Sequence, residues 1–242
     1  MKFEIKHRWS GSVLFETEAE TQREAILKAV KSGSNLRGSD LRGSDLSDSN
    51  LSGSNLSDSD LSGSNLRDSD LSGSYLRGSN LRGSNLRGSD LSGSNLRDSD
   101  LRDSNLSDSD LSGSNLRGSN LRDSDLSGSN LTPIRDDFFA VLSCAPREVA
   151  ALRMALTNGK VNGSTYHGEC ACLVGTIANA QHVNLRSIPG LQPNSARPAE
   201  RFFLAIREGD TPETNQFSAL AVQWLDQWVA NMESAFGTKA SA

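Results

Sequence analysis

Residues 44–63 read SDLSDSNLSGSNLSDSDLSG, a stretch in which leucine stands at every fifth position. The same period extends outward in both directions, from Leu36 to Leu131, and a serine stands two residues before each of these leucines. Neither the 3.6-residue period of a helix nor the two-residue alternation of a strand places an apolar residue at every fifth position. The period therefore predicts a solenoid, in which each pentad forms one short side and a turn.

Each pentad has two positions that are expected to face the interior, the leucine and the serine. The residue before the leucine is Asn or Asp except at Tyr75, and the two residues after it are Arg or Ser and then Gly or Asp, until Thr132 and Pro133 end the run. Gly, Asn and Asp suit corners because they tolerate turn and left-handed backbone. Neighbouring coils are expected to stack at the strand spacing of ~4.8 Å.

This pattern resembles the pentapeptide-repeat family, whose consensus is Ala, Asp or Asn, Leu and two variable residues. The resemblance covers residues 34–133 and implies a β-solenoid of the right-handed quadrilateral β-helix type, with four pentads in each of about five coils. The sequence carries a trace of this longer period, because Ser-Gly recurs at every fourth pentad from Ser52-Gly53 to Ser112-Gly113. One interior column should then contain the leucines Leu36, Leu56, Leu76, Leu96 and Leu116.

The small inward position departs from the family pattern. The family favours Ala there, whereas this chain has Ser in every pentad. We interpret this uniformity as an idealised, engineered repeat array. An unsatisfied buried hydroxyl costs roughly 1–3 kcal/mol, and net stability is only roughly 5–15 kcal/mol. We therefore predict that most of these hydroxyls donate to backbone carbonyls, with ordered water as the second choice.

The flanks have ordinary protein sequence and are predicted to cap the array. Residues 1–33 predict an N-terminal cap made of a β-hairpin (2–8 and 12–17) and a helix (21–31), which would cover an otherwise open strand edge. Residues 134–242 predict a mainly α-helical C-terminal capping domain with helices at 136–143, 146–157, 169–181, 196–208 and 217–236. Parts of the flanks resemble terminal regions of bacterial and phage-encoded pentapeptide-repeat proteins, a resemblance that implies no activity.

The formal net charge of −5 gives no general attraction to nucleic acid or to an anionic membrane surface. The N-terminus lacks a continuous apolar segment, and the odd number of cysteines argues against a disulfide framework. We expect a cytoplasmic protein without a nucleic-acid or membrane partner.

The outward positions of the repeats mix Asp with Arg, and two interpretations stay open. The first is a solvated, mutually neutralising surface. The second is DNA mimicry, since some members of the family are duplex-like inhibitors of a type II topoisomerase, DNA gyrase. Mimicry requires dense negative charge, and Arg on three of the four faces works against it. We interpret the face that carries the Ser-Gly pairs as a small-residue face chosen for simplicity, in preference to one that orders water or ice. Tyr75 is interpreted as a surface marker or a remnant of a parent sequence, in preference to a binding point.

Metal and catalytic sites are weakly indicated. The period of five and the absence of a Gly-Gly-x-Gly-x-Asp repeat argue against a calcium β-roll. A zinc site or a nucleophilic cysteine would require several of Cys144, His167, Cys170, Cys172 and His182 to converge, and the paired ligand motifs of structural zinc are incomplete. We predict no catalytic, cofactor-binding or metal-binding residues, and no cofactor.

The sequence as a whole predicts a non-enzymatic structural or interaction scaffold with an unidentified protein partner. The apolar stripe around Trp224 and Trp228 is expected to form core, which favours a monomer. A homodimer through the C-terminal helices is the alternative, because family members dimerise in this way.

Overall fold

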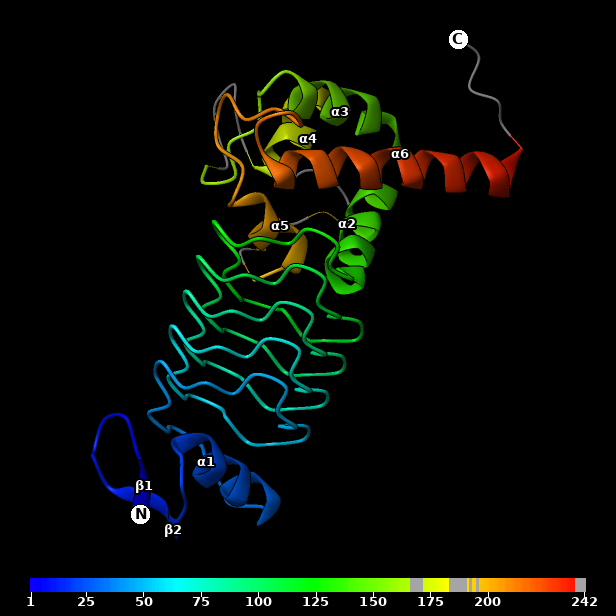
Figure 1. The fold of residues 1–242 in the computed structure, drawn as a ribbon. Coiled ribbons are helices and arrows are strands. Elements are labelled where there is room, and N and C mark those ends of the chain that lie inside the picture. The colour runs from blue at the N-terminus through cyan, green and yellow to red at the C-terminus, as the bar shows by residue number, and fades with distance from the viewer. Residues whose placement is uncertain (166–171, 183–190, 192, 195, 238–242) are drawn as a thin grey trace. The chain divides into compact units, whose positions relative to one another are not determined.

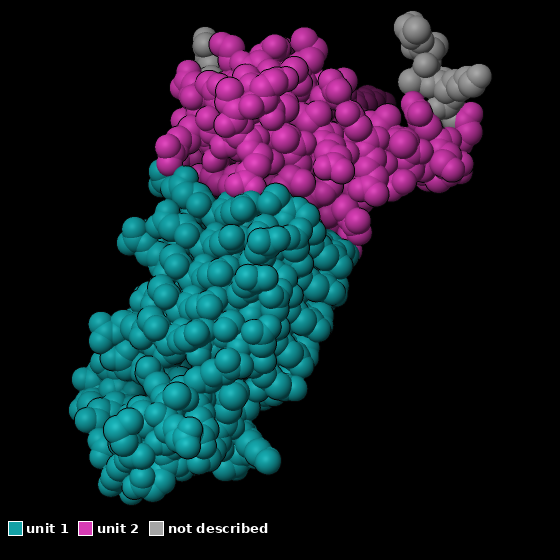
Figure 2. Space-filling model, viewed as in Figure 1, with its two compact units in different colours: residues 1–133 teal, residues 134–242 magenta. Residues whose placement is uncertain are grey.

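The computed structural model describes residues 1–165, 172–182, 191, 193–194 and 196–237. The chain divides into two compact units, Met1–Pro133 and Ile134–Ala242 (Figure 2).

The repeats of the first unit form a stack of coils (Figure 1). Single parallel bridges join residues that are four pentads apart, beginning with Asp40 and Asp60 and continuing to Asp110 and Asn130. Main-chain hydrogen bonds connect the same coils: Leu41 N–H donates to the Asp60 carbonyl at 2.8 Å, and Asp60 N–H donates to the Ser39 carbonyl at 2.9 Å. This register confirms that four pentads form one coil.

A β-turn follows the leucines of the array. The N–H of the residue three positions later donates to the leucine carbonyl, as from Ser84 to Leu81 at 3.1 Å. The second residue after leucine, always Gly or Asp before Pro133, has a positive φ, between 53° at Asp48 and 76° at Gly118. The first residue after leucine has no positive φ. A positive φ at the third position of the turn alone fits a type II turn. The Asn and Asp residues that precede leucine were also expected at corners, but they lie in the bridges instead.

Substitution at Gly73 tests the requirement for left-handed backbone. Gly73 has φ +62°, and a Cβ there would meet no atom within 4 Å. A substitution at this position therefore changes stability through backbone strain and not through a steric clash. We expect Gly73→Ala to lower the free energy of unfolding by about 1 kcal/mol, because an L residue with a Cβ is strained there. Gly73→Asn should cost clearly less, since Asn tolerates this conformation. Equal losses in urea unfolding would contradict the turn assignment.

The leucines form the core of the array. Every one from Leu36 to Leu131 is buried, with at most 4% of its surface exposed. The bridges align residues that are four pentads apart, and one interior column therefore contains, as expected, Leu36, Leu56, Leu76, Leu96 and Leu116.

The serine hydroxyls follow the prediction in three of four columns. Ser84 Oγ donates to the Leu81 carbonyl of the same coil at 2.6 Å, and Ser79 Oγ donates to the Leu56 carbonyl of the adjacent coil at 2.6 Å. The prediction is wrong for the fourth column, where four hydroxyls have no partner: Ser54, Ser74, Ser94 and Ser114. We call these four residues the unpaired serine column. The backbone N–H groups of these serines still make the hydrogen bonds of the turns, for example from Ser74 N–H to the Leu71 carbonyl at 3.1 Å. The turns therefore form without the hydroxyls.

The N-terminal segment contains the predicted hairpin and helix. Strands β1 (Lys2–Lys6) and β2 (Val13–Glu18) pair antiparallel, and helix α1 (Gln22–Lys31) follows them. The side chain of Thr21 accepts a hydrogen bond from Glu24 N–H at 3.1 Å and caps α1.

The end of β1 continues onto the first coil. Arg8 N–H donates to the Gly38 carbonyl at 2.7 Å, and Asp40 N–H donates to the Lys6 carbonyl at 2.8 Å. His7 and Ser39 form an antiparallel bridge between them. The backbone edge at residues 38–40 is therefore paired.

The second unit is mainly helical. Its elements are α2 (Thr132–Cys144), a 3-10 turn η1 (Pro146–Glu148), α3 (Val149–Thr157), α4 (Leu173–Gln181), α5 (Pro198–Phe203) and α6 (Gln216–Phe236). Helix α4 forms the later part of the helix expected at 169–181, and residues 169–171 lie outside the described residues.

The start of α2 and the end of α5 differ most from the predicted boundaries, and the first residues of the helix predicted at 146–157 form the 3-10 turn η1. Helix α2 begins earlier than expected because Pro133 suits a first helical turn. Helix α5 ends at Phe203, before the predicted end at residue 208. After Phe203 the turn tightens, because the N–H groups of residues 204–206 donate to the carbonyls three residues earlier, at 3.0 to 3.2 Å. The Ile206 carbonyl then accepts a hydrogen bond from Gly163 N–H at 2.9 Å.

An aromatic cluster forms part of the core of this unit. The rings of Phe202 and Trp224 lie 5.0 Å apart, and so do those of Phe202 and Phe217. Among the described residues, no helix combines the length and apolar character that a membrane crossing requires.

Candidate functional site

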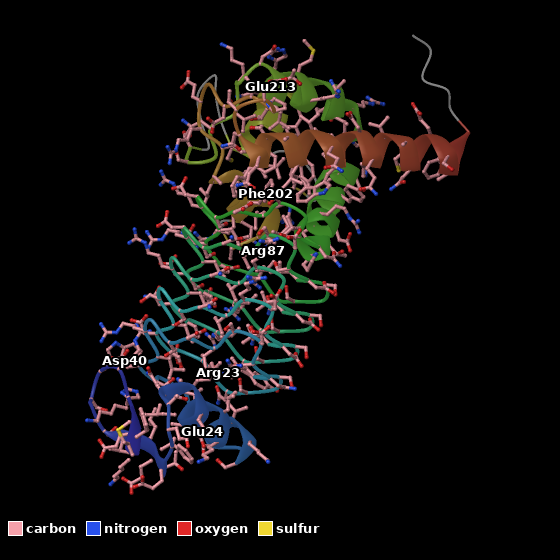
Figure 3. All side chains as sticks on the ribbon, viewed as in Figure 1. Arg23, Glu24, Asp40, Arg87, Phe202 and Glu213 are labelled. Atoms are coloured by element: carbon pink, nitrogen blue, oxygen red, sulfur yellow. The ribbon has the colours of Figure 1, made fainter. Side chains whose placement is uncertain are left out.

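The outward positions of the repeats form the largest regular surface of the first unit. Arg and Asp on this surface are mostly exposed and lie along the outside of the stack, as Arg87 does in Figure 3. Some pairs join neighbouring coils, with the Asp one coil and one residue after the Arg: Arg37 with Asp58 at 3.0 Å and Arg82 with Asp103 at 2.9 Å. Exposed pairs of this kind are worth little individually.

Other ion pairs lie within a single coil side. Arg102 contacts Asp100 at 2.5 Å, and the hydrogen bonds from this guanidinium lower the pKa of Asp100. Arg42 lowers the pKa of Asp40 in the same way. For Arg42, the position one coil and one residue later is Gly63, so this Arg pairs with a carboxylate of its own coil. The surface has both signs interspersed, as the first interpretation expected.

The Ser-Gly face contains Ser52-Gly53, Ser72-Gly73, Ser92-Gly93 and Ser112-Gly113. It carries three bridged carboxylates, Asp70, Asp90 and Asp110. Each accepts a hydrogen bond from the backbone N–H two residues later, at 2.8 to 2.9 Å. These oxygens therefore cap their own turns, in the manner of Asx turns. The acidic column is a structural part of the repeats.

Tyr75 replaces Asn or Asp in one bridge position. It pairs with Asn55 and Asn95 through the backbone, as any other residue of that column does, and 55% of its surface is exposed. No described aromatic ring stacks on it, and its role is unexplained by the coil geometry.

The cysteine and histidine candidates are dispersed over the described part of the second unit. Cys172 precedes α4 and is buried, and burial raises the pKa of its thiol to about 11. A protonated thiol is neither a nucleophile nor a metal ligand. Cys144 is exposed at the end of α2, and His182 ends α4 with φ 54°. His167 and Cys170 lie outside the described residues. In the described ranges, no three His, Cys, Asp or Glu side chains form a metal-binding group.

Comparison with known proteins identifies the repeats. The sequence profile of the family described as pentapeptide repeats matches residues 32–68, 64–103 and 94–132, with 8 copies. A pentapeptide repeat protein of the Arabidopsis thaliana thylakoid lumen is 34% identical, over 43% of this chain and 77% of that chain, with a TM-score of 0.38. The chain belongs to the pentapeptide-repeat family. Its repeats thus have the fold of that family, the right-handed quadrilateral β-helix.

Other solved pentapeptide-repeat proteins are similar to smaller degrees. One from Nostoc PCC 7120 is 27% identical, over 44% of this chain and 93% of that chain, with a TM-score of 0.24. QnrB1, described as a plasmid-mediated fluoroquinolone resistance protein, is 22% identical, over 40% of this chain and 60% of that chain, with a TM-score of 0.19. No curated protein matches the chain.

One surface feature was missed from the sequence. Trp224 and Trp228 are buried core residues, as expected. The apolar stripe of α6 continues beyond Trp228, the last buried residue of the helix, to the exposed Phe236. The length of α6 was the available signal, because a helix of 21 residues spans about 31 Å. This is long compared with the other helices of its unit.

Proposed function

We propose that this pentapeptide-repeat protein is a non-enzymatic structural or interaction scaffold, with an idealised, designed repeat array of about five coils between two terminal caps. The proposal rests on one observation: the coils are joined through backbone atoms, as in the bond from Leu86 N–H to the Asn105 carbonyl at 2.7 Å. Outward side chains are not needed for that ladder. The outer positions can therefore carry surface chemistry while the inward Leu and Ser maintain the stack.

The uniformity of the repeats supports the designed character. Ser occupies every small inward position even where its hydroxyl has no partner, as at Ser74 and Ser94. A buried unpaired hydroxyl is costly, and selection for stability would favour Ala at those positions. Uniform Ser fits a consensus rule that was applied to all four columns alike. We place such a protein in the cytoplasm.

The alternative function is inhibition of DNA gyrase by DNA mimicry. The repeat surface has fifteen Asp and ten Arg, and so a net charge of −5. Five coils span roughly 24 Å at the strand spacing, whereas a duplex of that length carries about fourteen phosphates. The charge density is about a third of the duplex value. The Arg residues would also oppose any surface that attracts phosphate.

We expect the purified protein to leave DNA supercoiling by gyrase unchanged across a titration in which a true mimic inhibits. The matched variant changes Asp70, Asp90 and Asp110 to Asn, which removes the one carboxylate column without adjacent Arg and retains the turn-capping oxygens. Wild type and variant should behave alike. Dose-dependent inhibition by the wild type that weakens in this variant would overturn the scaffold proposal in favour of mimicry.

A further inference from the structure

One side of the repeat array is basic, although the array as a whole is acidic. We call it the basic side, and it contains the outward residues of every fourth pentad, at 35–38, 55–58, 75–78, 95–98 and 115–118. It carries four Arg and two Asp, whereas the other three sides together carry six Arg and thirteen Asp. A negatively charged partner is therefore attracted to this side and repelled by the others.

The arginines of the basic side lie one above another in successive coils. The Arg97 carbonyl accepts a hydrogen bond from Gly78 N–H at 2.9 Å, and the Arg117 carbonyl accepts one from Asp98 N–H at 2.9 Å. Arg77 is bonded to the preceding coil in the same way. The three side chains therefore leave the backbone at intervals of about one strand spacing, ~4.8 Å.

The carboxylates of the basic side do not neutralise its arginines. Asp98 Oδ2 lies 3.8 Å from Arg77 Nε and 3.2 Å from Arg97 Nε, so two guanidinium groups share one carboxylate. Arg117 is exposed and forms no ion pair with any residue that the structure describes. Positive charge thus remains for the carboxylates of a partner, which match the guanidinium group in geometry.

The two most exposed aromatic rings of the first unit lie on the same side. Tyr75 is part of the basic side and is 55% exposed. Trp9 is 68% exposed and belongs to the hairpin loop beside the first coils (Figure 1). Arg8 anchors this loop, because its guanidinium lies 4.5 Å from the centre of the Trp9 ring and its Nη1 donates to the Asp58 carbonyl at 3.1 Å. Both phenylalanines of this unit are half-buried.

We propose that the basic side binds an extended acidic segment of a partner protein. Its carboxylates would contact the guanidinium groups, and its apolar side chains would pack on Tyr75 and Trp9. Arg, Tyr and Trp are the residue types that carry most of the binding energy in protein interfaces. Five coils span roughly 24 Å at the strand spacing, which an extended chain covers with about seven residues. This inference rests on the proposed function as an interaction scaffold and specifies the partner.

The charge balance favours a protein segment over nucleic acid. The basic side has an excess of only two Arg over Asp, which suits a segment with two or three carboxylates. A duplex of the same length carries about fourteen phosphates. Such a polyanion would also be repelled by the acidic sides that flank the basic one.

Fluorescence anisotropy of the full chain with a labelled peptide tests the proposal. The probe is a peptide of alternating Glu and Tyr, about eight residues long so that it spans the side. We expect it to bind, and to bind more weakly as salt is added, because exposed charges are screened. A peptide of alternating Gln and Tyr should bind at least roughly tenfold more weakly, since it lacks the carboxylates.

A triple variant tests the arginines. Arg77→Ser, Arg97→Ser and Arg117→Ser together should weaken binding of the Glu-Tyr peptide by at least roughly tenfold, because three of the four arginines of the basic side are removed. The coil accepts Ser at this position, since Ser57 occupies it in the second coil. Circular dichroism and urea unfolding should therefore show a folded array.

The matched control is Arg42→Ser, Arg82→Ser and Arg122→Ser on the next side. It changes the net charge of the chain by the same amount, and Ser62 shows that Ser is accepted there too. That side has five Asp and four Arg, and at physiological salt its charges act over only about 8 Å. Peptide affinity should stay within about twofold of wild type. An equal loss in both triple variants would show that the peptide responds to total charge alone and would overturn the proposal.

Tyr75→Asn tests the aromatic contact. Asn is the residue of this column in the neighbouring coils, at Asn55 and Asn95, so the backbone bridges should form as before. We expect peptide binding to weaken by roughly fivefold, the effect of losing one anchor of an interface, with no change in urea unfolding. An unchanged affinity would show that Tyr75 is not part of a binding surface and would contradict the proposal.

Two further results would overturn the proposal. One is failure of the acidic peptide to bind. The other is tighter binding of a single-stranded DNA oligonucleotide of the same length, which would identify nucleic acid as the partner. Neither would overturn the scaffold function itself, because the gyrase titration tests that function separately, through the carboxylates of the Ser-Gly face.

Discussion

Changing the unpaired serine column to Ala should stabilise the repeat array by about 4 kcal/mol, at about 1 kcal/mol per site. The change is Ser54, Ser74, Ser94 and Ser114 to Ala in one protein. Each hydroxyl has no hydrogen-bond partner, and three of the four side chains are at least nine-tenths buried. An unsatisfied buried hydroxyl costs roughly 1–3 kcal/mol, so the expected gain is a conservative one. Urea unfolding followed by circular dichroism measures it.

A second column provides the control. Ser64, Ser84, Ser104 and Ser124 occupy the same pentad position on the opposite side of the coil, are all buried, and all donate to Leu carbonyls. Changing these to Ala should lower stability, by about 2 kcal/mol in total at roughly 0.5 kcal/mol per satisfied bond. The two variants remove the same atoms but should differ in sign. Effects of the same sign would mean that hydroxyl pairing does not decide the energetics of the array.

Gly163→Ala should destabilise the second unit by about 3 kcal/mol, the upper range for overpacking. A Cβ at this buried position would lie 1.7 Å from the Phe203 carbonyl oxygen and 2.7 Å from Leu204 Cα. These are backbone atoms and cannot rotate away, so the segment after α5 must move. That movement would also break the bond from Gly163 N–H to the Ile206 carbonyl.

Tryptophan fluorescence can follow this unit if Trp9 is first changed to Phe, because Trp224 and Trp228 then supply the signal. Gly237→Ala is the control, since Gly237 caps α6 with φ +65° and a Cβ there would meet no atom within 4 Å. It should cost about 1 kcal/mol from backbone strain alone. A similar loss at both positions would show that the close approach at Gly163 can relax.

The sequence predicts the repeat array well because its decisive interactions recur at a fixed spacing. Leu at every fifth position and Ser-Gly at every fourth pentad determine the coil, its register and the inward column of Leu36. Pairing of each hydroxyl is a finer matter. All these serines occupy the same position of the pentad, yet Ser74 lacks the bond that Ser84 makes.

The second unit was predicted less completely because its contacts are nonlocal. No Gly or Pro follows Phe203 before Gly209, so the sequence does not predict the end of α5. The segment after this helix bonds to Gly163, far earlier in the chain. The exposed end of α6 likewise depends on where the rest of the unit stops covering this helix, which is after Trp228. The amphipathic stripe continues to Phe236 without a break, and periodicity alone does not distinguish a buried side from one that faces solvent.

The register of four pentads makes the length of the protein adjustable in discrete steps. Removing residues 74–93, one full coil, would bring Ser94 to the place of Ser74 and leave every later side chain in a column of its own kind. Removing a single pentad would shift everything that follows by a quarter of a circuit, so that an Arg side would continue into a Ser-Gly side. Insertion or deletion of a whole coil in the gene would therefore preserve the surface pattern of the protein. Insertion or deletion of one pentad would change the order of residues on all four sides after that point.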